Sequence, residues 1–231
     1  MRITYYGHSA FMFDIDGKKV LIDPFLTGNP KALKIDLKDL KPDYILITHG
    51  HGDHVGDAEE IAKHSGAPIV SNYEIATWFQ NKGVKDVIGL NLGGGVDLSF
   101  GRVQLVPAWH SSQLPDGSNG GTAGGFIITP NENKDADGTF YVSGDTALFQ
   151  EMKLFGKRHK IDHAFLCLGD HFTMDMVDAA HAADFLGTEN VIGMHFDTFP
   201  PIVIDHQKAF DLFAKAGKKL TLPEIGQTFE I

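Results

Sequence analysis

Short apolar runs divided by polar turns recur along the chain, and this pattern predicts a mixed α/β protein. The first runs predict strands over residues 2–6, 11–15 and 19–23, with Asp16-Gly17 suited to the tight turn between the last two. Residues 43–48 form an apolar run typical of a strand buried on both faces. Helical spacing of apolar residues follows over 55–63, so a buried strand is expected to pass almost directly into a helix.

Further runs predict the remaining elements, with a long loop over residues 24–42 and a glycine-rich segment over 111–125. The expected strands cover residues 68–71, 87–90, 97–100, 103–107, 126–129, 139–143, 163–168, 191–194 and 228–231. The expected helices cover residues 73–81, 149–155, 174–186 and 206–215. Residues 2–106 and 125–231 are each rich in strands and end in helices. We therefore expect two sheet-plus-helix halves packed face to face in one domain, residues 1–231.

Metal-ligating side chains crowd together where the buried strand meets the first helix, in the segment Thr48-His49-Gly50-His51-Gly52-Asp53-His54. In an extended segment alternate residues share a side, so His49 and His51 can face one cation while Asp53 and His54 face a second. Imidazole and carboxylate suit zinc and its neighbours, and glycine lets the backbone turn closely around an ion. The segment therefore predicts a metal site at the carboxyl edge of a sheet.

The pattern Thr-His-x-His-x-Asp-His after a hydrophobic strand resembles the signature of the metallo-β-lactamase superfamily, and the likeness runs through the whole chain. The resemblance implies an α/β (α+β) fold, a four-layer αββα sandwich, with a dinuclear metal centre at the joint edge of two mixed sheets. It also implies three later ligands, and each of the matching residues here follows an apolar run. By this resemblance, the ligands of the first ion are His49, His51 and His110, and those of the second ion are Asp53, His54 and His195. Asp145 is the ligand that bridges the two ions.

More narrowly, several segments resemble a small, poorly characterised branch of metal-dependent hydrolases, which is similar to the L-ascorbate-6-phosphate lactonases. These segments are Gly7-His8-Ser9, residues 21–25, 144–149 and 169–174, and Thr198-Phe199-Pro200. The likeness implies the scaffold and leaves the substrate open, because function resides in the site rather than in the fold.

Residues beside the expected ligands are candidates for supporting roles. Asp23, at the end of a strand, is expected to accept the second N–H of a motif histidine and so orient it. His8 is expected to donate a proton or to hydrogen-bond substrate, with a purely structural role as the alternative. Asp170 is expected to position a leaving group or a ligand histidine, unless it serves only at a helix N-terminus. The other candidates are Asp53, as a catalytic group besides a ligand, and Gly124 and Thr198, for substrate contact.

Two cations that share a water molecule can bring its ionisation near neutral pH, so a bridging hydroxide is the expected nucleophile. The same ions polarise a carbonyl or phosphoryl oxygen and take up the charge that develops on it. We therefore expect hydrolysis of an ester, lactone, amide or phosphodiester in a small-molecule substrate, and the ligand set does not choose among these bonds. Two zinc ions are expected, with manganese, iron or nickel as competitors.

Charge and composition narrow the class of partner. The chain carries 20 Lys and Arg against 30 Asp and Glu, a formal net charge of −10. The arginines are Arg2, Arg102 and Arg158, too few for a basic track along RNA or DNA, so a nucleic-acid substrate is not expected. No apolar run has the length of a signal-peptide core or a membrane span, and we expect a cytoplasmic enzyme. A symmetric homo-oligomer is also expected.

Other interpretations stay open. A metal-binding or metabolite-sensing protein without turnover would carry the same ligands, and among enzymes a nuclease or phosphodiesterase is the alternative. The segment after His195 is short for the added helical domain of a glyoxalase-II-like thioesterase. The glycines of residues 111–125 predict either a mobile flap over the metals or close backbone packing. The single cysteine, Cys167, lies in an apolar run and is expected to be a buried, inert thiol.

Overall fold

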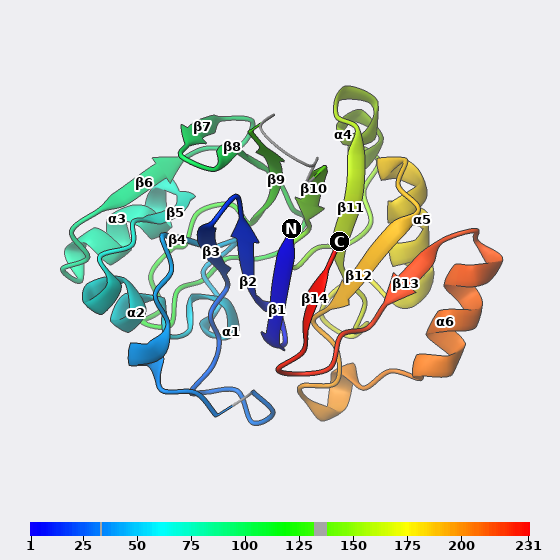
Figure 1. Ribbon diagram of the computed structural model, residues 1–231, viewed down its shortest axis with the longest axis horizontal. Helices are drawn as coiled ribbons and strands as arrows, with labels where there is room; N and C mark the ends of the chain where they lie inside the picture. Colours follow the sequence, from blue (N-terminus) through cyan, green and yellow to red (C-terminus); the bar gives the residue numbers. More distant parts are fainter. Residues whose placement is uncertain (33, 132–137) are drawn as a thin grey trace.

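Two seven-stranded mixed sheets pack face to face in the computed structural model, which describes residues 1–32, 34–131 and 138–231 (Figure 1). Helices cover the outer face of each sheet, so the layers run helix, sheet, sheet, helix. The two ends of the chain lie close together because the last strand pairs with the first. This is the four-layer αββα sandwich that the sequence predicts.

The first sheet has the strand order β14-β1-β2-β3-β4-β5-β6. Its neighbours are antiparallel from β14 to β3 and parallel from β3 to β6. The strands are β1 (Arg2–Gly7), β2 (Ala10–Ile15), β3 (Lys18–Ile22), β4 (Tyr44–Leu46), β5 (Ile69–Asn72), β6 (Val87–Leu90) and β14 (Thr228–Glu230).

The second sheet repeats this plan, with the strand order β13-β12-β11-β10-β9-β8-β7. It is parallel from β13 to β10 and antiparallel from β10 to β7. The strands are β7 (Gly95–Leu98), β8 (Gly101–Pro107), β9 (Gly124–Pro130), β10 (Thr139–Val142), β11 (Ile161–Cys167), β12 (Asn190–Met194) and β13 (Lys219–Thr221).

Among the described residues, three α-helices accompany each sheet, and helix α3 packs on β5 and β6 while α5 packs on β11 and α6 on β13. The helices are α1 (Gly52–Val55), α2 (Ala58–Ser65), α3 (Tyr73–Asn81), α4 (Met152–Arg158), α5 (Met176–Leu186) and α6 (His206–Lys215). Two 3₁₀ helices, η1 (Leu37–Asp39) and η2 (Pro200–Ile202), lie in loops. Within the described residues, no helix is both long enough and apolar enough to cross a membrane.

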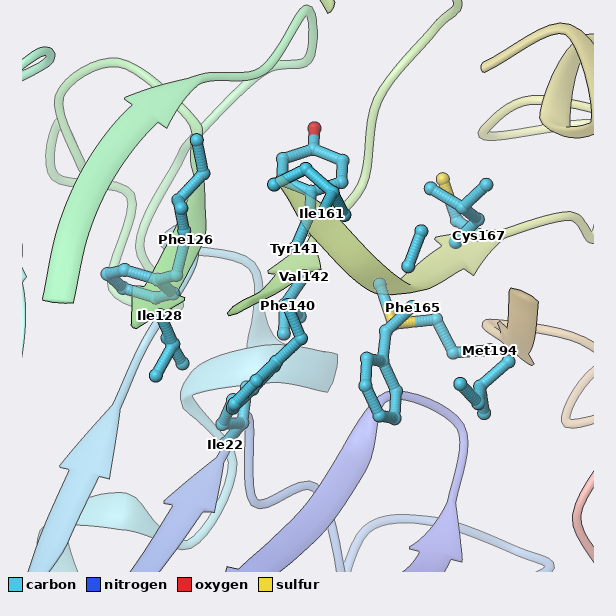
Figure 2. Packing of buried hydrophobic residues seen from close by; sticks show 14 of the residues in the cluster. Ile22, Phe126, Ile128, Phe140, Tyr141, Val142, Ile161, Phe165, Cys167 and Met194 are labelled. Atoms are coloured by element: carbon cyan, nitrogen blue, oxygen red, sulfur yellow. The ribbon is translucent and has the colours of Figure 1, made fainter. Parts of the chain in front are cut away.

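The core follows from the two-residue period of the strands. In β3, Val20 and Ile22 face the second sheet, whereas Leu21 between them faces the helices outside the first sheet. Figure 2 shows Ile22 close to Phe140 and Phe165, which come from the second sheet. Burying a side chain of this size stabilises the fold by roughly 1.5–3 kcal/mol, so the interface between the sheets is a major source of stability.

The helix expected over residues 55–63 is wrong in its bounds, because the chain forms two helices there. Helix α1 ends at Val55 and α2 starts at Ala58, with Gly56 between them at φ +36°. A side chain at Gly56 would lie 2.3 Å from the carbonyl oxygen of Pro24, and that oxygen accepts a hydrogen bond from the N–H of Asp57. Contact with a distant loop therefore breaks the helix.

The expected division of the chain into two halves, with one sheet formed by residues 2–106 and the other by residues 125–231, is also wrong. Strands β7 and β8 precede residue 108 yet belong to the second sheet, and β14 returns from the end of the chain to the first. Strand β13, a short and largely exposed segment, was not predicted. The Asp16-Gly17 turn was predicted, and both residues have positive φ, as a two-residue hairpin turn of this hand requires.

Candidate metal centre

All seven residues that the sequence proposes as ligands gather at one edge of the sandwich. His49 and His51 follow β4, and His110, Asp145 and His195 follow β8, β10 and β12. The remaining two residues, Asp53 and His54, lie in α1 rather than in an extended segment. The strand ends meet at this edge because both sheets direct these strands toward it.

Donor atoms within this cluster form three overlapping groups, and in each group they lie within 4.8 Å of one another. The groups are His49, His51 and His110; His49, His54 and Asp145; and His8, Asp53, His54 and His195. The first group and most of the third reproduce the two expected ligand sets. The third group also contains His8, which the sequence places among the supporting residues.

Hydrogen bonds behind the cluster fix which ring nitrogen of two histidines faces it. Thr48 donates its hydroxyl to Asp23 at 2.7 Å, so its oxygen is free to accept from Nδ1 of His49 at 3.0 Å. Asp23 also accepts from Nδ1 of His54 at 2.8 Å. Both imidazoles therefore turn Nε2 toward the centre, and in neutral His49 this nitrogen is unprotonated, which is the form that binds a metal.

Several atoms of the cluster are placed to bind a cation. Nε2 of His49 and Nδ1 of His51 lie 3.0 Å apart, a distance that fits either a hydrogen bond between them or two ligands of one ion. Nε2 of His54 and Oδ1 of Asp145 are buried and have no hydrogen-bond partner, although they lie 3.3 Å apart. Since orphaned buried polar groups are costly, the donor set fits divalent metal ions at this position.

The protonation states of His49 and Asp145 agree with this fit. Burial alone would lower the pKa of His54, but Asp145 and Asp23 outweigh it and raise that pKa well above its usual value, so an ion bound there would replace a proton on the ring. Burial and the neighbouring His54 hold the pKa of His49 well below its usual value. Burial alone would raise the pKa of Asp145, but His195 and His54 outweigh it and lower that pKa well below its usual value. Near neutral pH, His49 is therefore neutral and Asp145 ionised, and metal ligation requires both of these forms.

The cluster has a buried floor and an open mouth. His49, His54, Asp145 and His195 expose at most 2% of their surface, whereas the side chain of Asp53 is 31% exposed. His51 and His110 are half-buried on the same open side. The residues at the open mouth are therefore Asp53, His51 and His110.

Backbone strain is concentrated around this edge. Among the described residues other than glycine, seven have positive φ, and all but Asp16 lie in loops at the metal centre or beside it. They are His8, Asp23, Asp170, His171, His195 and Asp197. Such conformations cost about 1–3 kcal/mol each and occur most often at functional sites.

A family model described as a beta-lactamase superfamily domain matches residues 18–196. The chain belongs to the β-lactamase superfamily. A UPF0173 metal-dependent hydrolase from Flavobacterium johnsoniae is 47% identical over 231 residues and is covered in full, as is this chain. Another, from Exiguobacterium sp., is 48% identical over 234 residues with full coverage of both chains. These relatives make the protein a metal-dependent hydrolase of this superfamily.

Solved structures agree with this assignment. Igni18, a metallo hydrolase from Ignicoccus hospitalis, matches with a TM-score of 0.87 and 36% identity over 100% of this chain and 98% of its own. The isothiocyanate hydrolase from Delia radicum gut bacteria matches with a TM-score of 0.78, covering 100% of this chain and 99% of that one. At 20% identity, the second likeness shows the shared fold alone.

The supporting residues of the hydrolase occupy different positions relative to the metal centre. Asp23 holds His54 and Thr48, as described above. The ring of His8 lies between two partners, with Nδ1 2.9 Å from Oγ1 of Thr198 and Nε2 3.2 Å from Oδ2 of Asp53. Burial lowers the pKa of His8 to about 4, against the opposing effect of Asp53, so the ring is neutral near pH 7. Thr198 is buried and contacts His8, and its predicted contact with substrate stays a prediction.

Asp170 and Gly124 lie outside the three donor groups. Asp170 is exposed on the loop after β11, and this loop is held near the centre because the N–H of Met174 donates to the carbonyl of Thr146. Gly124 is buried in β9, where its N–H donates to the carbonyl of Thr48 and a Cβ would lie 2.7 Å from Leu105. Close packing thus accounts for this glycine, and its role in substrate binding stays a prediction.

Three supporting hydroxyl residues were missed by the sequence analysis. Thr48 links Asp23 to His49, Oγ of Ser111 lies 3.2 Å from Nε2 of His51, and Ser112 accepts from the N–H of Gly50. Only their position in the sequence could have identified them, since each lies within two residues of a ligand candidate. Hydroxyl residues are common in loops, so this signal is weak without the fold.

The glycine-rich segment 111–125 is tied to the rest of the hydrolase at many points, which favours packing over a mobile flap. Gly120 donates its N–H to the carbonyl of Ser112, whose hydroxyl donates back to the carbonyl of Gly120. Asn72 donates its side-chain amide to the carbonyls of Gly120 and Thr122. Leu114 is buried in the cluster between the first sheet and its helices.

Proposed function

We propose that this hydrolase cleaves an ester, lactone, amide or phosphodiester bond of a small molecule at a centre of two divalent ions. The observation that carries the proposal is the position of Asp145 between the donor groups. Its Oδ2 lies 3.0 Å from Nε2 of His195 and 3.6 Å from Nε2 of His110, and its Oδ1 lies 3.3 Å from Nε2 of His54. A carboxylate that reaches both groups supports a bridging ligand, and imidazole with carboxylate favours zinc.

Two such ions would supply Lewis-acid activation of a water molecule and of the substrate's carbonyl or phosphoryl oxygen. The chain supplies the rest. The buried hydrogen bonds of Asp23 and Thr48 hold His49 and His54 in fixed orientations, so little reorganisation accompanies reaction. The partly exposed carboxylate of Asp53 lies at the mouth, where it is placed to hold a proton and return it to the leaving group.

The surroundings of the centre support a small substrate rather than a nucleic acid. Arg2 pairs with Asp14 and Arg102 with Asp97, both on strands away from the donor groups. In the described part of the chain, the ion-pair partners of Asp53 and Asp145 are all histidines. A nuclease would require a basic surface for its phosphates, and this mouth offers no sign of one.

The test begins with protein stripped by a chelator and reloaded with zinc or with manganese. Hydrolysis of a p-nitrophenyl ester, a lactone, an anilide and bis(p-nitrophenyl) phosphate is measured against ions bound per chain. We expect activity to rise with the second ion and to vanish in Asp145→Ala, which should bind both ions more weakly. Thr228→Ala, at an exposed position in β14, is the matched control. Full activity with one ion per chain would contradict the dinuclear centre, and two bound ions without turnover of any substrate would favour the metabolite-sensing alternative.

A further inference from the structure

The two sides of the metal centre are unequal in their donors. The first group consists of three imidazoles, and two of these, His51 and His110, lie at the open mouth. The other group has four donor residues, including the carboxylate of Asp53, and its three histidines are at most 2% exposed. The difference in number arises from His8, which stands in the turn after β1.

The hydrogen bonds of His8 allow two arrangements. In the first, Thr198 donates its hydroxyl to the carbonyl of Phe196, 3.3 Å away, and its oxygen accepts from Nδ1 of His8. A neutral imidazole carries one N–H, so Nε2 then presents a lone pair to the carboxylate of Asp53 at 3.2 Å. Two acceptors at that distance repel each other unless a cation lies beside both. In the second arrangement, Thr198 donates to Nδ1, and Nε2 donates to Asp53.

The distance between His8 and Asp53 matches that of two ligands on one ion, whereas the 3.9 Å between Nε2 of His195 and Oδ2 of Asp53 is longer. Metal bonds of about 2.1 Å, separated by about 90–110°, place neighbouring donor atoms about 3.0–3.4 Å apart. The 3.2 Å between Nε2 of His8 and Oδ2 of Asp53 falls in this range. The ring of His8 lies 4.1 Å from that of His195 and 5.6 Å from that of His54, centroid to centroid, so the three rings converge on one place.

We propose that His8 is a further protein ligand of the second ion, beside Asp53, His54, His195 and the bridging Asp145, and that this ion binds before the first. The inference rests on the proposed dinuclear centre. Four unshared donors, one of them a carboxylate, favour tighter binding on this side. His8 lies outside residues 18–196, the part matched by the family model, so that match carries no information about it.

The consequence concerns the path of substrate. An ion enclosed by protein donors keeps few positions for other ligands, whereas a catalytic ion needs an open position. His51 and His110, which would hold the first ion together with His49, are both partly exposed. We therefore expect this ion to offer a coordination position to substrate, and the ion beside His8 to anchor the centre.

The test uses cobalt(II) as the probe and does not depend on turnover. Metal-free protein is titrated with Co²⁺ while binding heat and proton NMR spectra are recorded. After one equivalent, we expect three strongly shifted imidazole N–H signals, from His8, His54 and His195. The variant His8→Ala should show two such signals and bind its first Co²⁺ more than about 100-fold more weakly. Thr198→Val, which keeps the ring of His8, should lose about 10-fold or less.

Two further variants separate the sides of the centre. His110→Ala should leave the first binding event unchanged and weaken the second, and His171→Ala, at an exposed histidine, should alter neither. Two shifted signals in the unmodified protein would overturn the proposal, because His8 would then only orient Asp53. Loss of the first event in His110→Ala would overturn the order of binding. If His8→Ala fails to fold, the signal count of His110→Ala still decides, because the first group then keeps two imidazoles while the group with His8 keeps three. A single binding event whose three signals persist in His110→Ala would contradict the dinuclear centre while supporting His8 as a ligand.

Discussion

Asp23 accepts a hydrogen bond of 2.8 Å from Nδ1 of His54, and both residues are fully buried beneath the metal centre. The same carboxylate accepts from the N–H and the hydroxyl of Thr48 at 2.9 and 2.7 Å. Asp23 stands directly after β3 at φ +42°, and Thr48 stands after β4, so one carboxylate ties two parallel strands to the centre. Its charge both orients His54 and raises the electron density of the ring toward a metal.

We therefore expect Asp23→Asn to weaken metal binding on the His54 side by about 10–100-fold, because an amide is a weaker acceptor than a carboxylate. Isothermal titration with Zn²⁺ measures this change. The control is Asp14→Asn, which removes a surface carboxylate that pairs with Arg2. Unchanged affinity in Asp23→Asn would show that the hydrogen bond serves only the fold.

The loop that carries Asp170 is expected to act in turnover rather than in metal binding. A side chain at Gly169 would lie 2.1 Å from the carbonyl of His195, so this loop lies directly against that ligand. Asp170→Asn should leave metal content unchanged and lower kcat by a factor of about 10²–10⁴, as expected for a group in proton transfer. Steady-state kinetics with elemental analysis measures both quantities.

The matched control for this variant is Asp16→Asn. Asp16 is also an exposed aspartate at positive φ, but it lies in the β2–β3 turn, away from the donor groups. It should keep full activity. If Asp170→Asn has the kcat of the wild-type protein, the role of Asp170 is purely structural, in its strained loop.

The segment 111–125 is expected to be rigid in the free enzyme. Ser112→Ala removes a hydroxyl that accepts from Gly50 and donates to Gly120, so it leaves buried backbone groups without partners. We expect a loss of about 1–3 kcal/mol in the free energy of unfolding and faster amide exchange at Gly120. The control is Ser118→Ala, at the exposed tip of the loop. Rapid amide exchange at Gly120 in the unmodified protein would instead support the interpretation of the segment as a mobile flap.

Cys167 is expected to resist thiol reagents in the native protein. Its thiol is fully buried in β11, 3.6 Å from Oγ of Ser143, and burial raises its pKa to about 11. At pH 8 only about one thiol in a thousand would be ionised, and the thiolate is the reactive form. Iodoacetamide should therefore label the native protein at least about 100-fold more slowly than the guanidinium-unfolded protein, as mass spectrometry can measure. Rapid native labelling would mean that β11 opens readily.

Much of the candidate site could be predicted from local sequence. The types and spacing of the residues from Thr48 to His54 indicate metal binding. Few other functions require imidazole and carboxylate side chains so close together in sequence after a buried strand. His110, Asp145 and His195 could be placed because each ends an apolar run, and strand ends meet at one edge of such a sheet. The resemblance to a known family supplied their pairing.

Other features depended on contacts between distant segments. The break at Gly56 follows from the carbonyl of Pro24, and no local pattern records that contact. The pairing of β14 with β1 brings the last residues of the chain to the first sheet, although their pattern predicts only a strand. Which strands pair depends on how the buried faces of whole sheets pack together. The periodicity of a segment therefore identifies a strand but does not indicate which strands lie beside it.

The sequence by itself determined most of the strands and, through its family resemblance, the layers and seven candidate ligands, since hydrophobic period and ligand chemistry are local properties. The tertiary structure decided how the donors divide. It placed His8 3.2 Å from Asp53, although 45 positions separate them in the chain, and it left His51 and His110 at the open mouth. Distance and burial are properties of the packed chain, because the position of one side chain near another is fixed only when both sheets close around the same core.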